Sequence, residues 1–245
     1  MRWQGLGWLI DDHRIRQPWG ITVLAIICCS LSGVSIAAPE TSPSPSALRQ
    51  VLAPKKPAPS PAAESLLDPK TFPKGWLHHT AQKNAPLAGT WKIDASDSKA
   101  PVLICVGKPA GYLRTVKIYE NFELRLEWKY PRNPNGNSGV LIHTSGEDKI
   151  WPRSIQVQLH GPVAGSIFPS GGAQSDNKVE AKGLSRGVNE WNTCVITSKN
   201  GTISVEINGR KAGTLTGCNP KKGCIALQSE GSEVHFRNMQ IRVLK

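Results

Sequence analysis

The strongest constraint on the fold is a nine-residue segment, residues 122–130, in which apolar and polar side chains alternate without a break. Its letters are FELRLEWKY. Successive side chains of a β-strand point to opposite faces, so this alternation predicts a strand with one buried face and one face toward solvent. The polar positions carry Glu, Arg, Glu and Lys in turn, which is typical of an ion-paired outer face.

Further segments that predict strands follow one another from about residue 86 onward. They cover residues 140–142, 155–159, 203–207, 224–228 and 234–244. The turn signal Asn208-Gly209 follows the third of them and predicts a hairpin. Helical periodicity is almost absent. Many short strands separated by Gly, Pro and Asn predict an all-β protein, an antiparallel sandwich or barrel.

The first 37 residues have the pattern of a secretory signal peptide. Arg14 and Arg16 precede an apolar run, residues 21–29, and Ser35-Ile36-Ala37 provides a small-residue cleavage site. An uncleaved membrane anchor is the alternative, although the run is short for a membrane span. The pattern predicts export to the periplasm, the cell surface or the medium, with no stable membrane insertion after cleavage.

The next segment, residues 38–65, is dominated by Pro, Ala and Ser. Such a composition cannot bury a core and favours extended chain. We predict a disordered linker here, followed by one domain over residues 66–245.

The chain is strongly basic, with a formal net charge of +12. This charge makes an acidic polymer an alternative ligand. However, the Lys and Arg residues are spread out and no run of five or more basic residues occurs. The distribution therefore predicts a solvated basic surface and no nucleic-acid partner.

Four cysteines lie outside the signal segment: Cys105, Cys194, Cys218 and Cys224. In an exported chain they allow up to two disulfides, in three connectivities. Cys218 and Cys224 are separated by a short turn-rich segment, so we predict that these two pair.

One predicted strand carries an unusual polar row. In residues 154–160, SIQVQLH, the apolar side chains at 155, 157 and 159 face the core. The polar residues then share the opposite face: Gln156, Gln158 and His160. Uncharged donors and acceptors in a row suit sugar hydroxyls, and an ordinary solvent-facing strand is the alternative.

Other candidates lie at the ends of predicted strands. Asn137 belongs to a Gly/Asn loop that can bring amide donors to a ligand, and His143 ends the strand that follows. Glu230 precedes a glycine and is a candidate general base, with Arg237 as an orienting cation. A surface ion pair is the alternative for these two. Trp191 is a candidate stacking platform for a sugar, or a core tryptophan.

The motifs of several enzyme classes are absent from the sequence. It has no dinucleotide-binding glycine pattern, phosphate loop, nucleophile elbow or H-E-x-x-H zinc motif. Sandwich glycosidases of the concanavalin-like type carry two acids on one strand, and the comparable strand here carries Gln156 and Gln158. Catalysis by paired carboxylates is therefore not predicted.

Eight short segments together resemble the 3-keto-disaccharide hydrolase family. In chain order they are GYLRT (111–115), NFELRLEW (121–128), NSGV (137–140), IQVQ (155–158), EWN (190–192), NG (208–209), LQSEG (227–231) and FRN (236–238). The resemblance covers about residues 86–245. It implies a concanavalin-like jelly-roll sandwich that cleaves glycosides already oxidised to a ketone at carbon 3, by hydrolysis or elimination, sometimes with a divalent metal.

This implied chemistry needs a single base, because a 3-ketone acidifies the proton at carbon 2 and its removal lets the aglycone leave from carbon 1. The candidate bases are Glu230, His160 and His143. The candidate groups for the enolate oxygen are Arg114, Asn137, Gln158 and a bound metal. The predicted substrate-binding residues are Arg114, Asn137, Gln156, Gln158, Trp191 and Arg237.

The chain departs from the family at Gln156, where the family usually has Glu. A glutamine cannot take up a proton and is a poorer ligand for a cation. Two hypotheses follow from the sequence: a secreted enzyme that cleaves 3-keto-glycosides, and a non-catalytic carbohydrate-binding sandwich at the cell surface.

Overall fold

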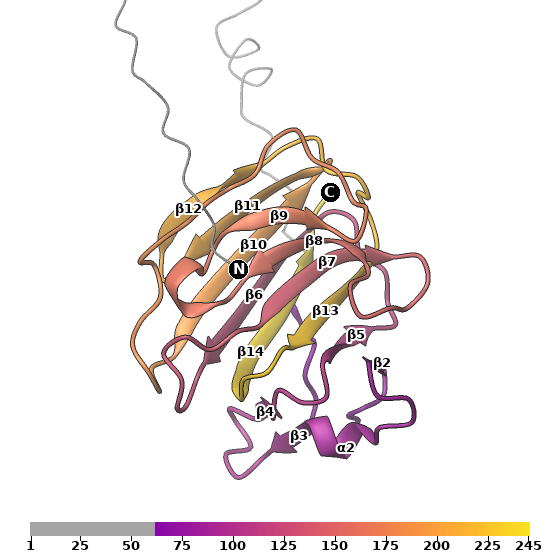
Figure 1. Ribbon diagram of the computed structural model, residues 1–245, viewed down its shortest axis with the longest axis vertical. Helices are drawn as coiled ribbons and strands as arrows, with labels where there is room; N and C mark the ends of the chain where they lie inside the picture. The colour runs from indigo at the N-terminus through magenta and orange to yellow at the C-terminus, as the bar shows by residue number, and fades with distance from the viewer. Residues whose placement is uncertain (1–61) are drawn as a thin grey trace, which may run out of the picture. The chain divides into compact units, whose positions relative to one another are not determined.

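The computed structural model describes residues 62–245, which form two antiparallel sheets packed face to face (Figure 1). This confirms the predicted all-β sandwich. The predicted signal peptide, residues 1–37, and most of the predicted linker lie outside the described residues. Over residues 62–245, no helix is long and apolar enough to cross a membrane.

The larger sheet contains eight strands. They are β1 (Glu64–Ser65), β3 (Trp91–Asp94), β4 (Val102–Cys105), β6 (Phe122–Lys129), β10 (Asn192–Lys199), β11 (Thr202–Ile207), β12 (Arg210–Leu215) and β14 (Val234–Val243). Their order is β12-β11-β10-β6-β14-β4-β3, and β1 pairs with β14. Because β1 is part of this sheet, the folded domain begins inside the segment predicted as linker.

The smaller sheet contains six strands. They are β2 (Trp76–Thr80), β5 (Gly111–Thr115), β7 (Gly139–Ser145), β8 (Arg153–Gln158), β9 (Ile167–Ser170) and β13 (Cys224–Ser229). Their order is β2-β5-β13-β7-β8-β9. Two single turns of helix complete the described elements: α2 (Leu87–Thr90) and the 3₁₀ turn η1 (Gly161–Val163).

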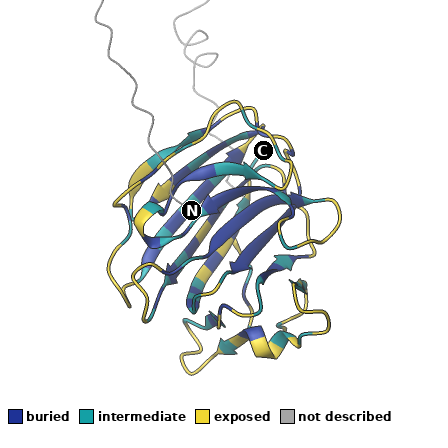
Figure 2. Cartoon of the chain, in the orientation of Figure 1, coloured by how far each residue is buried: buried dark blue, intermediate teal, exposed yellow. Residues whose placement is uncertain are grey.

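The core lies between the sheets and is formed by the apolar residues of facing strands, which are largely buried (Figure 2). On β6 the apolar positions are at most 1% exposed: Phe122, Leu124, Leu126 and Trp128. Each such burial stabilises the fold by roughly 1.5–3 kcal/mol. The charged side chains between them point outward, where Arg237 Nε donates to Glu127 at 2.7 Å and Arg242 Nη2 donates to Glu123 at 3.0 Å. The predicted ion-paired outer face of this strand is confirmed.

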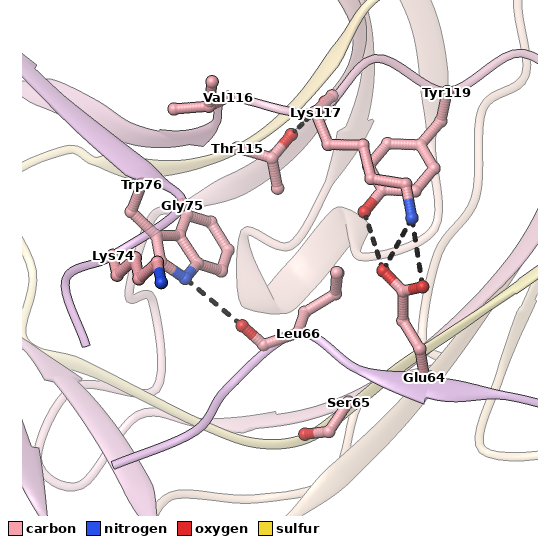
Figure 3. Close-up of a pocket in the computed structure, with 10 residues that line it drawn as sticks. All are labelled: Glu64, Ser65, Leu66, Lys74, Gly75, Trp76, Thr115, Val116, Lys117 and Tyr119. Carbon is pink, nitrogen blue, oxygen red and sulfur yellow. Dashed lines mark hydrogen bonds and ion pairs between the residues drawn. The ribbon is translucent and has the colours of Figure 1, made fainter. Parts of the chain in front are cut away.

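The start of the domain is held to the smaller sheet by polar contacts around one pocket of about 420 Å³ (Figure 3). The Trp76 indole donates to the Leu66 carbonyl at 3.2 Å. Lys117 Nζ donates to both oxygens of Glu64, at 2.9 and 3.0 Å. None of the predicted site residues lines this pocket. Its contacts explain how β1 is attached, and they indicate no chemistry.

The predicted disulfide is wrong, because Cys218 and Cys224 are both free thiols. Cys218 packs in the core between the sheets, with its Sγ 4.0 Å from the Leu215 carbonyl oxygen. Cys224 points away from that core, with its Sγ 3.6 Å from Arg114 Nη1. Although the two residues are close in the sequence, the strand that begins at Cys224 turns its side chain to the other side of the sheet.

We therefore predict that both thiols react with iodoacetamide when the native protein is denatured without reductant. Peptide mapping checks this directly, since trypsin cleaves at Lys221 and Lys222 between the two cysteines. Recovery of a linked peptide pair that appears only without reductant would contradict the structure.

Candidate functional site

The outer face of the smaller sheet brings together most of the predicted site residues. Directly paired residues of antiparallel strands point to the same face. One row runs across all six strands: Leu77, Arg114, Ala226, Leu141, Gln156 and Phe168. The next row contains His79, Tyr112, Gln228, Gly139 and Gln158. The residues between the rows, such as Val140 and Leu227, belong to the core, so both rows face outward.

Three candidates continue this face beyond the strand ends. Glu230 follows Gln228 by two residues, and Asn137 precedes Gly139 by two. Asn137 and His160 both lie close enough to Glu230 to act on the pKa of its carboxyl group. The structure therefore brings Glu230, Asn137 and His160 into one cluster beside the row that contains Gln228 and Gln158.

Glu230 is the carboxylate of this cluster, and its surroundings favour the protonated form. Burial raises the pKa of Glu230 above the ordinary carboxyl value, while the nearby Asn137 amide and His160 oppose the shift. Within residues 62–245, its Oε2 is buried and makes no hydrogen bond. A half-buried carboxylate with a raised pKa and one unengaged oxygen has the chemistry of a general base.

His160 and Gln158 have fixed orientations beside Glu230. The Nδ1 of His160 lies 3.1 Å from the Gly136 carbonyl oxygen. Because a carbonyl only accepts, Nδ1 carries the proton in the neutral ring and Nε2 is an acceptor. The Oε1 of Gln158 accepts from the backbone N–H groups of Leu159 and His160, each at 3.0 Å. This arrangement leaves the Gln158 Nε2 to donate.

Gln228 is a site residue that the sequence analysis missed. Gln228 is only 2% exposed, yet neither its Oε1 nor its Nε2 has a hydrogen-bond partner in the part of the chain that the structure describes. An unsatisfied buried amide costs about 1–3 kcal/mol, and a polar ligand can satisfy it. The signal that could have found Gln228 is the predicted strand 224–228, which places it on the same face as Glu230.

Gly139 makes room for the Gln228 side chain. A Cβ at this position would lie 2.2 Å from Gln228 Oε1, 3.2 Å from the Val157 carbonyl oxygen and 3.3 Å from Gln156 Nε2. The absence of a side chain therefore lets the two glutamine amides lie over β7.

Arg114 also lies on this face, but Asp148 engages its guanidinium. The Nε and Nη2 atoms donate to the two oxygens of Asp148, each at 2.8 Å. The Tyr112 hydroxyl donates to the same carboxylate at 2.7 Å. These contacts hold the β7–β8 loop against β5, across the intervening β13. The structure thus places Arg114 in a bidentate ion pair, which competes with its predicted role at an enolate oxygen.

His143 lies apart from this face, in contrast to the role predicted for it. Its backbone takes a φ of +54° at a bulge of β7, and the side chain is fully buried. Its Nδ1 lies 3.1 Å from the Pro220 carbonyl oxygen, and its Nε2 lies 3.1 Å from Ser198 Oγ. Burial lowers the pKa of His143. The bulge turns the ring toward the interior, against Phe122, so a ligand on the outer face does not reach it.

Trp191 and Arg237 come together, but on the outer face of the larger sheet. The Arg237 guanidinium lies 4.0 Å from the centroid of the Trp191 ring, and Lys129 Nζ lies 5.0 Å from it. Arg237 also donates to Glu127. Because the sheets of a sandwich are about 10 Å apart, this cluster is separated from Glu230 by the whole core.

The donor set around Glu230 does not fit a protein-held divalent cation. Among residues 62–245, no group of three or more His, Cys, Asp or Glu side chains is placed to hold a metal ion. The oxygen donors beside Glu230 are neutral amides, whereas Ca²⁺ and Mg²⁺ sites are built from several carboxylate and carbonyl oxygens or retain water.

A sandwich of two antiparallel sheets is the architecture of the jelly-roll class, which includes lectin domains. The fold is similar to a candidate glycosyl hydrolase from Parabacteroides distasonis, with a TM-score of 0.53 and 21% identity over 70% of this chain and 89% of that one. It is also similar to the carbohydrate-binding module CBM66 from Bacillus subtilis, with a TM-score of 0.52 and 10% identity over 69% and 95%. For the β-glucanase of Bacillus licheniformis these values are 0.50 and 12%, over 76% and 99%. Likeness at these identities shows a shared fold.

The sequence model of the 3-keto-alpha-glucoside-1,2-lyase-like domain matches residues 62–242. The chain therefore belongs to this family, which confirms the resemblance found in its short segments. No curated protein sequence matches the chain significantly. The match begins near β1, in agreement with the start of the folded domain.

We predict that Gly139→Ala displaces the Gln228 amide, because the new Cβ overlaps its Oε1. Since the displaced group is the end of a flexible side chain, the free energy of unfolding falls by only about 1 kcal/mol. Urea denaturation measures that loss, and the Nε2 amide signal of Gln228 in NMR spectra reports the displacement. Gly187→Ala is the control, because its nearest neighbour atom lies at 3.4 Å. An unmoved Gln228 signal would contradict this packing.

We further predict that Asp148→Asn lowers the free energy of unfolding by about 1–2 kcal/mol at pH 7, because a partly exposed bidentate ion pair is lost. The hydrogen bonds from Arg114 hold the pKa of Asp148 below its usual value. This stabilisation is therefore complete above about pH 4 and disappears as the pH falls through the lowered pKa. Denaturation of both proteins from pH 7 to pH 2 checks this. A difference that stays constant over the range contradicts the assignment.

Proposed function

We propose that the protein is an exported enzyme that cleaves 3-keto-glycosides, with Glu230 as the base that removes the proton at carbon 2. The observation that carries this proposal is Glu230 itself, a half-buried carboxylate with a raised pKa and an unengaged Oε2 beside a row of amides. Family membership supports the substrate class, since the family is named for the cleavage of 3-keto-α-glucosides. Export rests on the signal pattern of residues 1–37.

The reaction fits a site with one base. When the Glu230 carboxylate takes the proton from carbon 2, the electron pair is delocalised onto the ketone oxygen at carbon 3 as an enolate. Collapse of the enolate forms a double bond between carbons 1 and 2 and expels the aglycone with its glycosidic oxygen. That oxygen takes up a proton from solvent or from Glu230. Addition of water across the new double bond then gives the hydrolysis product.

The amides beside Glu230 have the chemistry to stabilise the enolate. Gln158 Nε2 is left to donate, because its Oε1 is held by backbone N–H groups. Gln228 carries a buried Nε2 without a partner among residues 62–245. Fixed donors aimed at a developing negative charge accelerate such reactions, because they need no reorganisation at the moment of proton transfer.

A second candidate function is carbohydrate binding without catalysis. The observation that favours it is Gln156, which lies on β8 in the outer face of the smaller sheet, at a position where the family usually has Glu. The amides of Gln156, Gln158 and Gln228 also suit the donors and acceptors of sugar hydroxyls. This candidate requires saturable binding of a glycan with no product.

We predict that Glu230→Gln lowers kcat on 3-keto-glucosides by about 10²–10⁴-fold, the usual contribution of a general base. Release of the aglycone, followed by mass spectrometry, measures the rate. Glu206→Gln is the matched control, because Glu206 is exposed on β11 of the other sheet. Turnover by the Glu230 variant at the wild-type rate would sink the assignment, and no turnover by a folded wild type would favour the binding protein.

The pH profile of the wild type gives a second test of the same base. Because the pKa of Glu230 is raised, the base form appears only above the ordinary carboxyl value of about 4.3. The acidic limb of kcat/KM therefore lies above that pH. The raised pKa also means that ionisation of Glu230 is disfavoured in the native state. The free energy of unfolding of the wild type, relative to Glu230→Gln, therefore falls as the pH rises from the ordinary carboxyl value to the raised pKa of Glu230.

A further inference from the structure

A pocket of about 330 Å³ opens on the outer face of the smaller sheet, on the side of Gln158 opposite β13. Its lining is mostly apolar and comes from three parts of the chain: Gln158, then Val163, Ser166 and Phe168, and then residues 178–182. Its volume is in the range of ordinary ligand pockets, which begins at about 300 Å³.

The outer wall of the pocket is a short strand-like segment added to β9. The backbone groups of Ile167 and Val179 exchange two hydrogen bonds, each of 2.9 Å. Ile167 faces the core, so Val179 does as well, and the alternating residues Lys178 and Glu180 face outward. The Ala181 N–H donates to Ser166 Oγ at 3.0 Å, which fastens the wall to the rest of the pocket.

The pocket shares Gln158 with the candidate site. Gln158 lines the pocket and also lies in the same row of outward-facing residues as Gln228. Val163 ends the turn η1, which begins directly after His160. A glycoside whose sugar lies between Glu230 and Gln158 can therefore extend its second half past Gln158 into the pocket.

The lining favours a flat apolar group over a second sugar. A sugar ring would place hydroxyls against mostly apolar surface, where they lose hydrogen bonds to water without replacement. An aromatic ring can stack against Phe168, and Lys178 and Lys182, which also line the pocket, carry ammonium groups that are attracted to an aromatic face.

We propose that this pocket is the leaving-group subsite of the enzyme and that it takes an aromatic aglycone, such as a phenol. The inference rests on the proposed function for the identity of the sugar half. The pocket itself is defined by Phe168 and the 178–182 wall.

Binding of two ordinary glucosides tests the subsite. Phenyl α-D-glucoside and methyl α-D-glucoside differ only in the aglycone, and neither has a 3-ketone to be turned over. Dissociation constants from NMR titration should show phenyl glucoside binding roughly fivefold tighter, the range of one aromatic stacking contact. Phenyl glucoside should also move the backbone amide signals of residues 163–168 and 178–182. Equal affinities, or shifts elsewhere, overturn the proposal.

Variants locate the preference in the pocket. Phe168→Leu keeps the side chain apolar but removes the ring, so the preference for phenyl should disappear. Phe72→Leu is the matched control, since Phe72 is also partly buried but does not line the pocket. The exposed pair Lys178→Ala and Lys182→Ala, which spares the core, should reduce the preference about two- to fourfold. A preference that survives in both Phe168→Leu and the lysine variant overturns the subsite.

The two proposals fail separately. If 3-keto-glucosides are not cleaved but the phenyl preference depends on Phe168, the subsite stands and the enzyme function falls. If cleavage depends on Glu230 but phenyl and methyl glucosides bind equally, only the subsite falls.

Discussion

The register of β13 between β5 and β7 is the constraint on which the candidate site depends. Leu227 lies in the core, opposite Leu113 on one side and Val140 on the other. This pairing turns Gln228 outward and leads the chain to Glu230 on the same face. A slip of one residue would exchange the faces, placing an amide in the core and leucine in the solvent. The apolar residues that stabilise the sandwich therefore also position the polar ones.

The two outer faces of the sandwich differ in how many charged side chains they carry and how these are paired. On the larger sheet, acidic and basic side chains alternate and pair, as Arg237 does with Glu127. On the smaller sheet, the outer face carries the glutamines Gln156, Gln158 and Gln228 on β8 and β13, and the ion pair of Arg114 with Asp148 starts from β5. Neutral amides bind water and sugar hydroxyls comparably well, and they can be buried at lower cost than charges. The outer face of the smaller sheet is thus the one whose side chains suit an uncharged polar ligand.

Some of the polar groups on this face lower the stability of the native state. Gln228 is buried with two unsatisfied polar atoms, and Glu230 is held where its ionised form is disfavoured. Groups of this kind lower the stability of the native state unless a ligand satisfies them. The close packing of Gly139 under Gln228 shows that the amide belongs to a defined arrangement rather than to a loosely packed surface. The core between the sheets, with side chains such as Trp128 fully buried, offsets this local cost.

The sequence by itself determined the strands β6, β7, β8, β11, β13 and β14, the sandwich class, the polar face of β8 and the family, because strand periodicity and turn residues act over a few positions. It also indicated Glu230, Asn137 and His160 as candidates. Only the tertiary structure decided which candidates meet. It placed Trp191 and Arg237 behind the core, turned His143 inward at a bulge, and separated Cys218 from Cys224. It also joined Arg114 to Asp148, 34 residues away in the chain. The physical reason is that strand order and sheet register are set by nonlocal packing, which no local pattern encodes.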